Sequence, residues 1–122
     1  MKYLIRHIVL LCGLLLAGCM KWDYGDTVED FNATGAGLFI TNEGNFQYGN
    51  ASLSYYDPET KQVQNEIFFR ANGMKLGDVA QSMIIHDNKG WVVVNNSHVI
   101  FAIDLNTFKE VGRIENLTSP RY

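Results

Sequence analysis

Short runs of β-branched and aromatic residues alternate with turn-forming residues along most of the chain, from residue 38 onward. Runs of this kind, bounded by Asp, Asn, Gly and Pro, are typical of strands joined by tight turns. No stretch has the period of an amphipathic helix, so we expect no helix in this region. The pattern predicts seven strands, at residues 38–42, 52–57, 63–69, 80–86, 91–95, 99–104 and 111–114.

The first residues follow a different pattern, with Lys2 and Arg6 ahead of an uncharged, mostly apolar run over residues 8–17. This run is about half of the ~20 residues that a helix needs to cross a bilayer. It therefore predicts an export signal at residues 1–18 and no permanent span. Leu16-Ala17-Gly18-Cys19 resembles the bacterial lipobox, and the resemblance implies that Cys19 is lipidated and anchors the protein to a membrane. The alternatives are an ordinary signal with a chance cysteine, or a disulfide between Cys12 and Cys19.

Residues 19–37 have neither helical nor strand periodicity, and we expect a flexible, acidic tether there. Lys21 and the scattered acidic residues behind it are similar to the surface-export tag of outward-facing Gram-negative lipoproteins. A plain solvated tether explains the same residues equally well.

Composition and charge narrow the function classes. Hydrophobic residues make up 47% of the chain and charged residues 19%, which is typical of a globular protein. The net charge is −3, and loss of Lys2 and Arg6 with the signal makes it more negative. We therefore expect no nucleic-acid partner, because such a protein needs a basic patch to neutralise phosphates.

A repeat with an offset of 47 residues lies within the strand-rich part. The shared string is an apolar strand, then Asp-x-x-Thr, then a turn and a second strand. One inserted residue after the threonine brings Lys61-Gln62-Val63 onto Lys109-Glu110-Val111. A period of 40 to 50 residues with three or four strands predicts blades of a β-propeller. The aligned pairs are Leu53 and Ile100, Asp57 and Asp104, Thr60 and Thr107, and Ile67 and Ile114.

The fold class predicted from this repeat is all-β, a partial β-propeller of about two blades over residues 38–122. The first blade, at about 38–69, has three strands and lacks its inner strand, and the second, at about 80–114, has four. Because propellers carry four to eight blades, we expect the chain to be the N-terminal fragment of a longer ring. The alternative is a self-contained small sheet of about seven strands.

Residues 38–42 (LFITN), 52–63 (SLSYYDPETKQV) and 91–104 (WVVVNNSHVIFAID) are similar to the repeat of YVTN and YncE-like propellers. Together with the lipobox, the chain resembles YncE-like surface lipoproteins encoded beside outer-membrane transporters, a group that includes cobamide-binding propellers. The resemblance implies a lipid-anchored protein on the surface of the outer membrane. Its expected ligand is a cobamide or a glycan, and its expected partner is an outer-membrane transporter.

The antiparallel order divides the connections between two rims of the blades. The first rim carries the compact turns 58–62, 87–90 and 105–110. The second rim carries the longer segments 43–51, 70–79, 96–98 and 115–122. Because longer loops on a rigid support usually carry binding residues, we expect the ligand on the second rim. Its candidate residues are Asn42, Glu43, Asn45, Phe46, Gln47, Tyr48, Arg70, Asn72, Lys75 and Asp78.

These residues combine rings that cover apolar area with amides that form hydrogen bonds, which suits a sugar or a corrinoid. The structural alternative is that Asn45 and Asn50 form turns and that Phe46 pins its loop to the sheet.

The sequence has no catalytic or metal-binding motif, and we expect His86 and His98 to be surface polar residues. We therefore expect no enzymatic activity and no cofactor. The alternatives are a protein-binding scaffold in the envelope, or a fragment of a propeller lactonase or quinoprotein-type enzyme.

Overall fold

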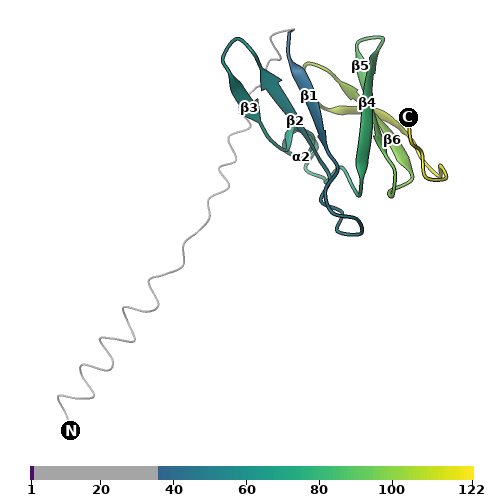
Figure 1. Cartoon of the computed structure of the whole chain (residues 1–122), viewed down its shortest axis with the longest axis horizontal. Coiled ribbons are helices and arrows are strands. Elements are labelled where there is room, and N and C mark those ends of the chain that lie inside the picture. Colours follow the sequence, from purple (N-terminus) through teal and green to yellow (C-terminus); the bar gives the residue numbers. More distant parts are fainter. Residues whose placement is uncertain (2–35) are drawn as a thin grey trace.

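The computed structural model describes Met1 and residues 36–122 (Figure 1). Cys19 and the rest of residues 2–35, which cover most of the predicted signal and tether, lie outside the described residues. The elements follow the order β1 (Leu38–Asn42), β2 (Ser52–Asp57), β3 (Gln62–Gln64), α2 (Ile67–Asn72), β4 (Ala80–His86), β5 (Lys89–Val94), β6 (Val99–Asp104) and β7 (Glu110–Ile114).

The strands form two antiparallel sheets in which neighbours in sequence are neighbours in space. The first sheet has the order β1-β2-β3 and the second β4-β5-β6-β7. Strand β1 of the first sheet lies beside β4 of the second (Figure 1). The described residues are therefore all-β in class, and their three- and four-stranded sheets agree with the expected partial propeller.

The 47-residue repeat is a structural repeat. β2 and β6 have the same length, and each ends in the aspartate of the Asp-x-x-Thr turn. Asp57 Oδ1 accepts hydrogen bonds from the backbone N–H of Glu59 (2.8 Å) and Thr60 (3.3 Å). Asp104 Oδ1 does the same for Asn106 (2.9 Å) and Thr107 (2.8 Å). The inserted residue, Phe108, lies between this turn and the next strand, and its side chain is buried in the core.

The expectation of a strand over residues 63–69 was wrong, as was the expectation of no helix. β3 ends at Gln64, and Glu66, at φ 55°, takes a left-handed conformation that interrupts the strand. The helix α2 follows and ends at Gly73, whose N–H donates to the carbonyl of Phe69 (2.8 Å) from a left-handed C-cap. Ile67 therefore lies in a helix and Ile114 in a strand, so that pair of the repeat has no structural basis.

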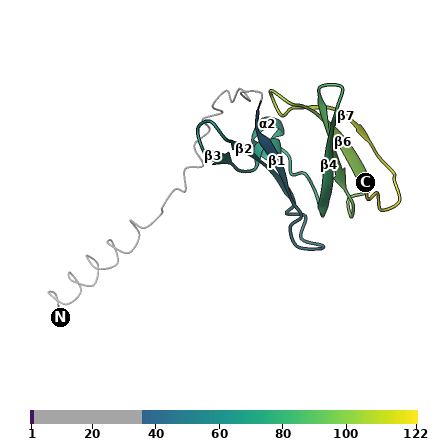
Figure 2. The same ribbon diagram turned by 45° about the horizontal axis from the view of Figure 1, so that its top comes forward.

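An apolar cluster from both sheets and α2 explains why this short segment is helical. The helix turns Ile67 and Phe68 inward together, and both are fully buried. The ring of Phe68 lies 5.0 Å from that of Phe101 in the second sheet. On the other side, Tyr55 packs against Phe108, with 5.8 Å between ring centroids. Figure 2 shows α2 between the two sheets, where a helix of six residues gains its stability from packing and not from its own length.

The turn between β4 and β5 and the loop between β1 and β2 lie on the rims that the strand order predicted. On the first rim, Asp87 and Asn88 connect β4 to β5 with positive φ angles of 55° and 56°, the geometry of a tight hairpin turn. β5 thus begins at Lys89, two residues earlier than expected. On the second rim, the loop between β1 and β2 extends beyond the strand ends as the long hairpin at the bottom of Figure 1.

Candidate ligand-binding site

The loop between β1 and β2 is held in one shape by its own amides. The side-chain oxygen of Asn50 accepts a hydrogen bond from the backbone N–H of Asn45 (2.8 Å). The N–H of Tyr48 donates to the carbonyl of Asn45 (3.0 Å). Gly44, at φ 76°, passes so close to Asn50 that an added Cβ would lie 2.6 Å from its side-chain oxygen. Asn45 and Asn50 therefore act in the turn itself, as the structural alternative predicted.

Asp78 ties this loop to two other segments of the second rim. Its carboxylate is buried, and Oδ2 accepts hydrogen bonds from the backbone N–H of Gln47 (2.7 Å) and from the amide of Asn96 (2.5 Å). The N–H of Asp78 donates to the hydroxyl of Ser97 (2.8 Å). One buried side chain thus fixes the loop 43–51 and the turn 95–98 on the connector between the sheets.

Gly77 allows the close approach that this arrangement needs. Its carbonyl accepts a hydrogen bond from the N–H of Ala51 (3.0 Å), which closes the base of the loop. Its φ is 124°, and an added Cβ would lie 2.4 Å from the hydroxyl oxygen of Ser97. Any other residue at this position would push the connector away from the turn 95–98.

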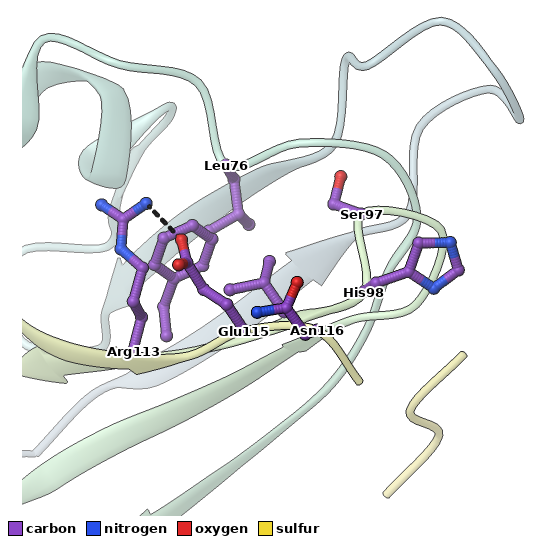
Figure 3. A pocket seen from close by; sticks show the side chains of 8 residues that line it. Leu76, Ser97, His98, Arg113, Glu115 and Asn116 are labelled. Atoms are coloured by element: carbon purple, nitrogen blue, oxygen red, sulfur yellow. Dashed lines mark hydrogen bonds and ion pairs between the residues drawn. The ribbon is translucent and has the colours of Figure 1, made fainter. Parts of the chain in front are cut away.

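A groove of about 560 Å³ opens beside the turn 95–98. His98 lies at one end and Arg113 at the other (Figure 3). Its floor is apolar and its edges carry a hydroxyl, an amide and charged groups. The groove is lined by Leu76, Ser97, His98, Val99, Phe101, Arg113, Glu115 and Asn116.

The charges in the groove are largely paired. Arg113 forms a two-pronged ion pair with Glu110, at 2.5 Å for each nitrogen–oxygen contact, and a longer one with Glu115 (3.4 Å). The hydrogen bond to Glu110 raises the pKa of Arg113 above its usual value. The guanidinium carbon lies 5.0 Å from the ring centroid of Phe101. Because Arg113 is already satisfied, the groove favours neutral, hydrogen-bonding ligands over simple anions.

A segment near the end of the described chain supports the wall at His98. The Nδ1 atom of His98 accepts a hydrogen bond from the N–H of Ser119 (3.2 Å), and its carbonyl accepts one from Leu117 (3.1 Å). The amide of Asn95 donates to the carbonyl of Pro120 (2.8 Å). The segment 115–122, expected on the second rim, therefore lies against the turn 95–98 that borders the groove.

A family model described as "Domain of unknown function (DUF5074)" matches residues 36–122, the whole strand-rich part. The chain belongs to the DUF5074 family. No curated protein matches the sequence significantly. Among the described residues of this DUF5074 domain, no helix is long and apolar enough to span a membrane. No group of three or more His, Cys, Asp or Glu side chains is placed to hold a metal ion in that same part of the chain.

The DUF5074 structure separates the predicted site residues by role. Phe46 is 63% exposed and Tyr48 74% exposed, so Phe46 does not pin its loop to the sheet. Glu43 is exposed on the same loop. Asn42 and Asp78 instead hold the structure together, since the amide of Asn42 donates to the hydroxyls of Ser52 (3.1 Å) and Ser54 (2.9 Å).

The candidate residues of the connector, Arg70, Asn72 and Lys75, also differ from one another in exposure and in contacts. Arg70, in the last turn of α2, and Lys75 are both exposed. Asn72 is turned to the first rim, where its amide donates to the carbonyl of Phe108 (3.1 Å) and its oxygen accepts from the N–H of Glu110 (2.9 Å). The structure thus gathers Gln47 and Asp78 on the second rim but uses Asn72 as a brace between α2 and the turn before β7.

Sequence reasoning missed two of the residues that line the groove. Phe101 and Arg113 lie directly opposite one another on β6 and β7, and both face the connector. Strand alternation could have placed Phe101 on the core side, because it alternates with Ile100 and Ala102. The position of Arg113 follows from a bulge between β6 and β7, which the sequence does not mark.

Proposed function

We propose that this DUF5074 protein is a non-enzymatic, lipid-anchored protein of the outer cell surface that binds a small ligand in support of outer-membrane uptake. The ligand class is a cobamide or a glycan. The observation that carries the proposal is the second rim, which has both a groove with largely paired charges and a fixed loop with two exposed aromatic rings.

The chemistry of this rim suits a large, hydroxyl- or amide-rich ligand. Phe46 and Tyr48 present rings on a loop whose middle is held by Asp78 through the N–H of Gln47, so little conformational freedom is lost on binding. Ser97 and Asn116 offer neutral donors and acceptors at the groove edge. Rings that cover apolar area, with amides and hydroxyls around them, are the usual means of recognising sugars and similar ligands.

The predicted lipid at Cys19 would place this rim at the surface of the outer membrane. Acyl chains on one cysteine would hold the domain at the outer membrane, and the tether over residues 19–37 would let it reach a transporter. Tethering raises the local concentration of captured ligand near that transporter. In this proposal the protein captures and hands over its ligand without changing it.

Titration calorimetry of the full chain in detergent, against cobalamin and a panel of glycans, tests the proposal. We expect heat of binding with one of the two classes. The double substitution Phe46→Ala and Tyr48→Ala should weaken that binding at least tenfold. Tyr56→Ala serves as the matched control, because Tyr56 pairs with Leu38 at the opposite end of the same hairpin. Absence of heat with every ligand, or equal loss in the control, would refute the proposal.

A further inference from the structure

The groove between His98 and Arg113 lies on the side of the second sheet that faces the connector. Leu76 comes from the connector itself, and Phe101 and Arg113 come from β6 and β7. Phe101 is 5% exposed and belongs to the core that the two sheets share, so the packing of the sheets places the groove. Its volume of about 560 Å³ lies within the ~300–1,000 Å³ range of sites for small ligands.

Arg113 is fully engaged within the protein. Its Nε and Nη2 atoms donate to the two carboxylate oxygens of Glu110, and its Nη1 atom donates to Glu115 (3.4 Å). Nη2 also contacts the sulfur of Met74 (3.8 Å), and one face of the guanidinium lies over the ring of Phe101. All three nitrogens of Arg113 therefore have partners, and the residue is poorly placed to select an anionic ligand.

Two carboxylates share this one guanidinium, and they share it unequally. Glu110 makes both contacts of the two-pronged pair, and its side chain is 18% exposed. Glu115 makes a single long contact, and its side chain is 58% exposed. Its second carboxylate oxygen, Oε2, has no hydrogen-bond partner among the described residues. Among the described residues that line the groove, Arg113 is the only lysine or arginine, so one negative charge stays uncompensated there.

The remaining polar groups of the groove are neutral. The hydroxyl oxygen of Ser97 accepts a hydrogen bond from the N–H of Asp78 (2.8 Å), which leaves the hydroxyl hydrogen free to donate. The amide of Asn116 is exposed and can both donate and accept. Figure 3 shows Glu115 extended toward the Arg113 end of the groove and Ser97 nearer the His98 end. The groove thus combines one anionic group with neutral groups that suit hydroxyls.

We infer that the groove binds a sugar that carries a free amine. The ammonium group pairs with the open oxygen of Glu115, and the hydroxyls of the sugar form hydrogen bonds with Ser97 and Asn116. A sugar acid meets repulsion from Glu115 and from a chain whose net charge is −3. A neutral sugar forms the hydrogen bonds but lacks the ion pair. This inference rests on the proposed binding function and narrows its ligand class.

Titration calorimetry of the full chain in detergent tests the inference with three oligosaccharides of equal length. They are a glucosamine oligomer, its N-acetylated counterpart and an oligomer of a uronic acid. At low salt and mildly acidic pH, where the amine is protonated, the glucosamine oligomer should bind about fivefold more tightly than the N-acetylated one, the upper range for a solvent-exposed ion pair. The uronic acid oligomer should bind most weakly.

Glu115→Gln should bring the glucosamine and N-acetylated oligomers to equal affinity and leave the N-acetylated oligomer unaffected. The matched control is Glu59→Gln, which removes one negative charge from an exposed position on the first rim and should keep the preference. Circular dichroism checks that both variants keep the spectrum of the parent.

The outcomes separate this inference from the proposed function. Equal binding of the amine and N-acetylated oligomers by the parent, or a preference that survives Glu115→Gln, would overturn the inference while sugar binding stands. Binding of cobalamin but of no sugar would overturn it as well and leave the proposed function in its cobamide form. No heat with any of these ligands would overturn both.

Discussion

Asp78 joins three segments that are far apart in the sequence. The loop 43–51, the connector between the sheets and the turn 95–98 meet at its carboxylate and its backbone N–H. Its second oxygen, Oδ1, is buried without a hydrogen-bond partner among the described residues. A buried group used in this way is costly to remove, because its former donors lose their acceptor.

We predict that Asp78→Ala lowers the free energy of unfolding by about 2–3 kcal/mol, since two donors to a charged acceptor are left unpaired. Amide hydrogen exchange in the loop 43–51 should accelerate more than exchange in β6. Asp78→Asn, which keeps one acceptor oxygen, should lose less. Urea unfolding measures the free energies of unfolding, and mass spectrometry measures the amide hydrogen exchange. The control is Glu59→Ala, an exposed carboxylate on the first rim. Equal losses for Asp78 and Glu59 would contradict this role.

At the scale of elements, the repeated Asp-x-x-Thr turn shapes both sheets in the same way. In each case the aspartate ends the strand and its carboxylate accepts the N–H groups of the turn that follows. The backbone hydrogen bond from Thr107 is the main cause that lowers the pKa of Asp104, because it stabilises the charged form. Asp57 makes the equivalent turn from a buried position.

We predict that Asp104 titrates below the ordinary value of 3.8 in the folded protein, as followed by NMR of its carboxyl carbon. A lowered pKa means that the turn contributes stability above pH 3.8, and that this contribution is lost as the pH falls through the folded-state value. Asp104→Asn should therefore flatten the fall in stability over that acid range. A midpoint at or above 3.8, or an unchanged acid profile in the variant, would show that the turn does not act in this way.

At the scale of the whole molecule, the two sheets share one apolar core with α2 between them. Phe68 contributes most directly from the helix, because it is 1% exposed and packs on Phe101 of the second sheet. Phe69, the next residue on the same helix, points outward and is 42% exposed. Adjacent phenylalanines thus provide a test of whether the sheets unfold as a single unit.

We predict that Phe68→Ala lowers the free energy of unfolding by about 3–5 kcal/mol, since it leaves a cavity between the sheets. Phe69→Ala should cost less than about 1 kcal/mol, because exposed substitutions change stability little. In both variants, tryptophan fluorescence and circular dichroism should report one coincident transition in urea. Separate transitions for the two signals would show that the sheets unfold independently, and similar costs for the two substitutions would show that Phe68 does not support the shared core.

Much of the fold could be predicted because strands and turns leave local marks. The predicted strands 38–42, 52–57, 80–86 and 99–104 agree with β1, β2, β4 and β6 residue for residue. The prediction of a strand over residues 63–69 was wrong for a physical reason. Ile67-Phe68-Phe69 is an apolar run that fits either a strand or a buried helix, and the local pattern does not distinguish the two. The groove was missed because Phe101 and Arg113 are twelve residues apart and meet only through strand pairing.

The sequence alone determined the all-β class, the 47-residue repeat and the rim to which the loop 43–51 belongs, since these depend on alternation, turn residues and strand order. Only the tertiary structure decided that Asp78 binds Gln47 and Asn96, that α2 replaces half of a strand, and that Arg113 closes a groove. The physical reason is the range of the interactions involved. Turns and alternation act over a few neighbours, whereas buried carboxylates, packed rings and grooves depend on which distant segments the core brings together.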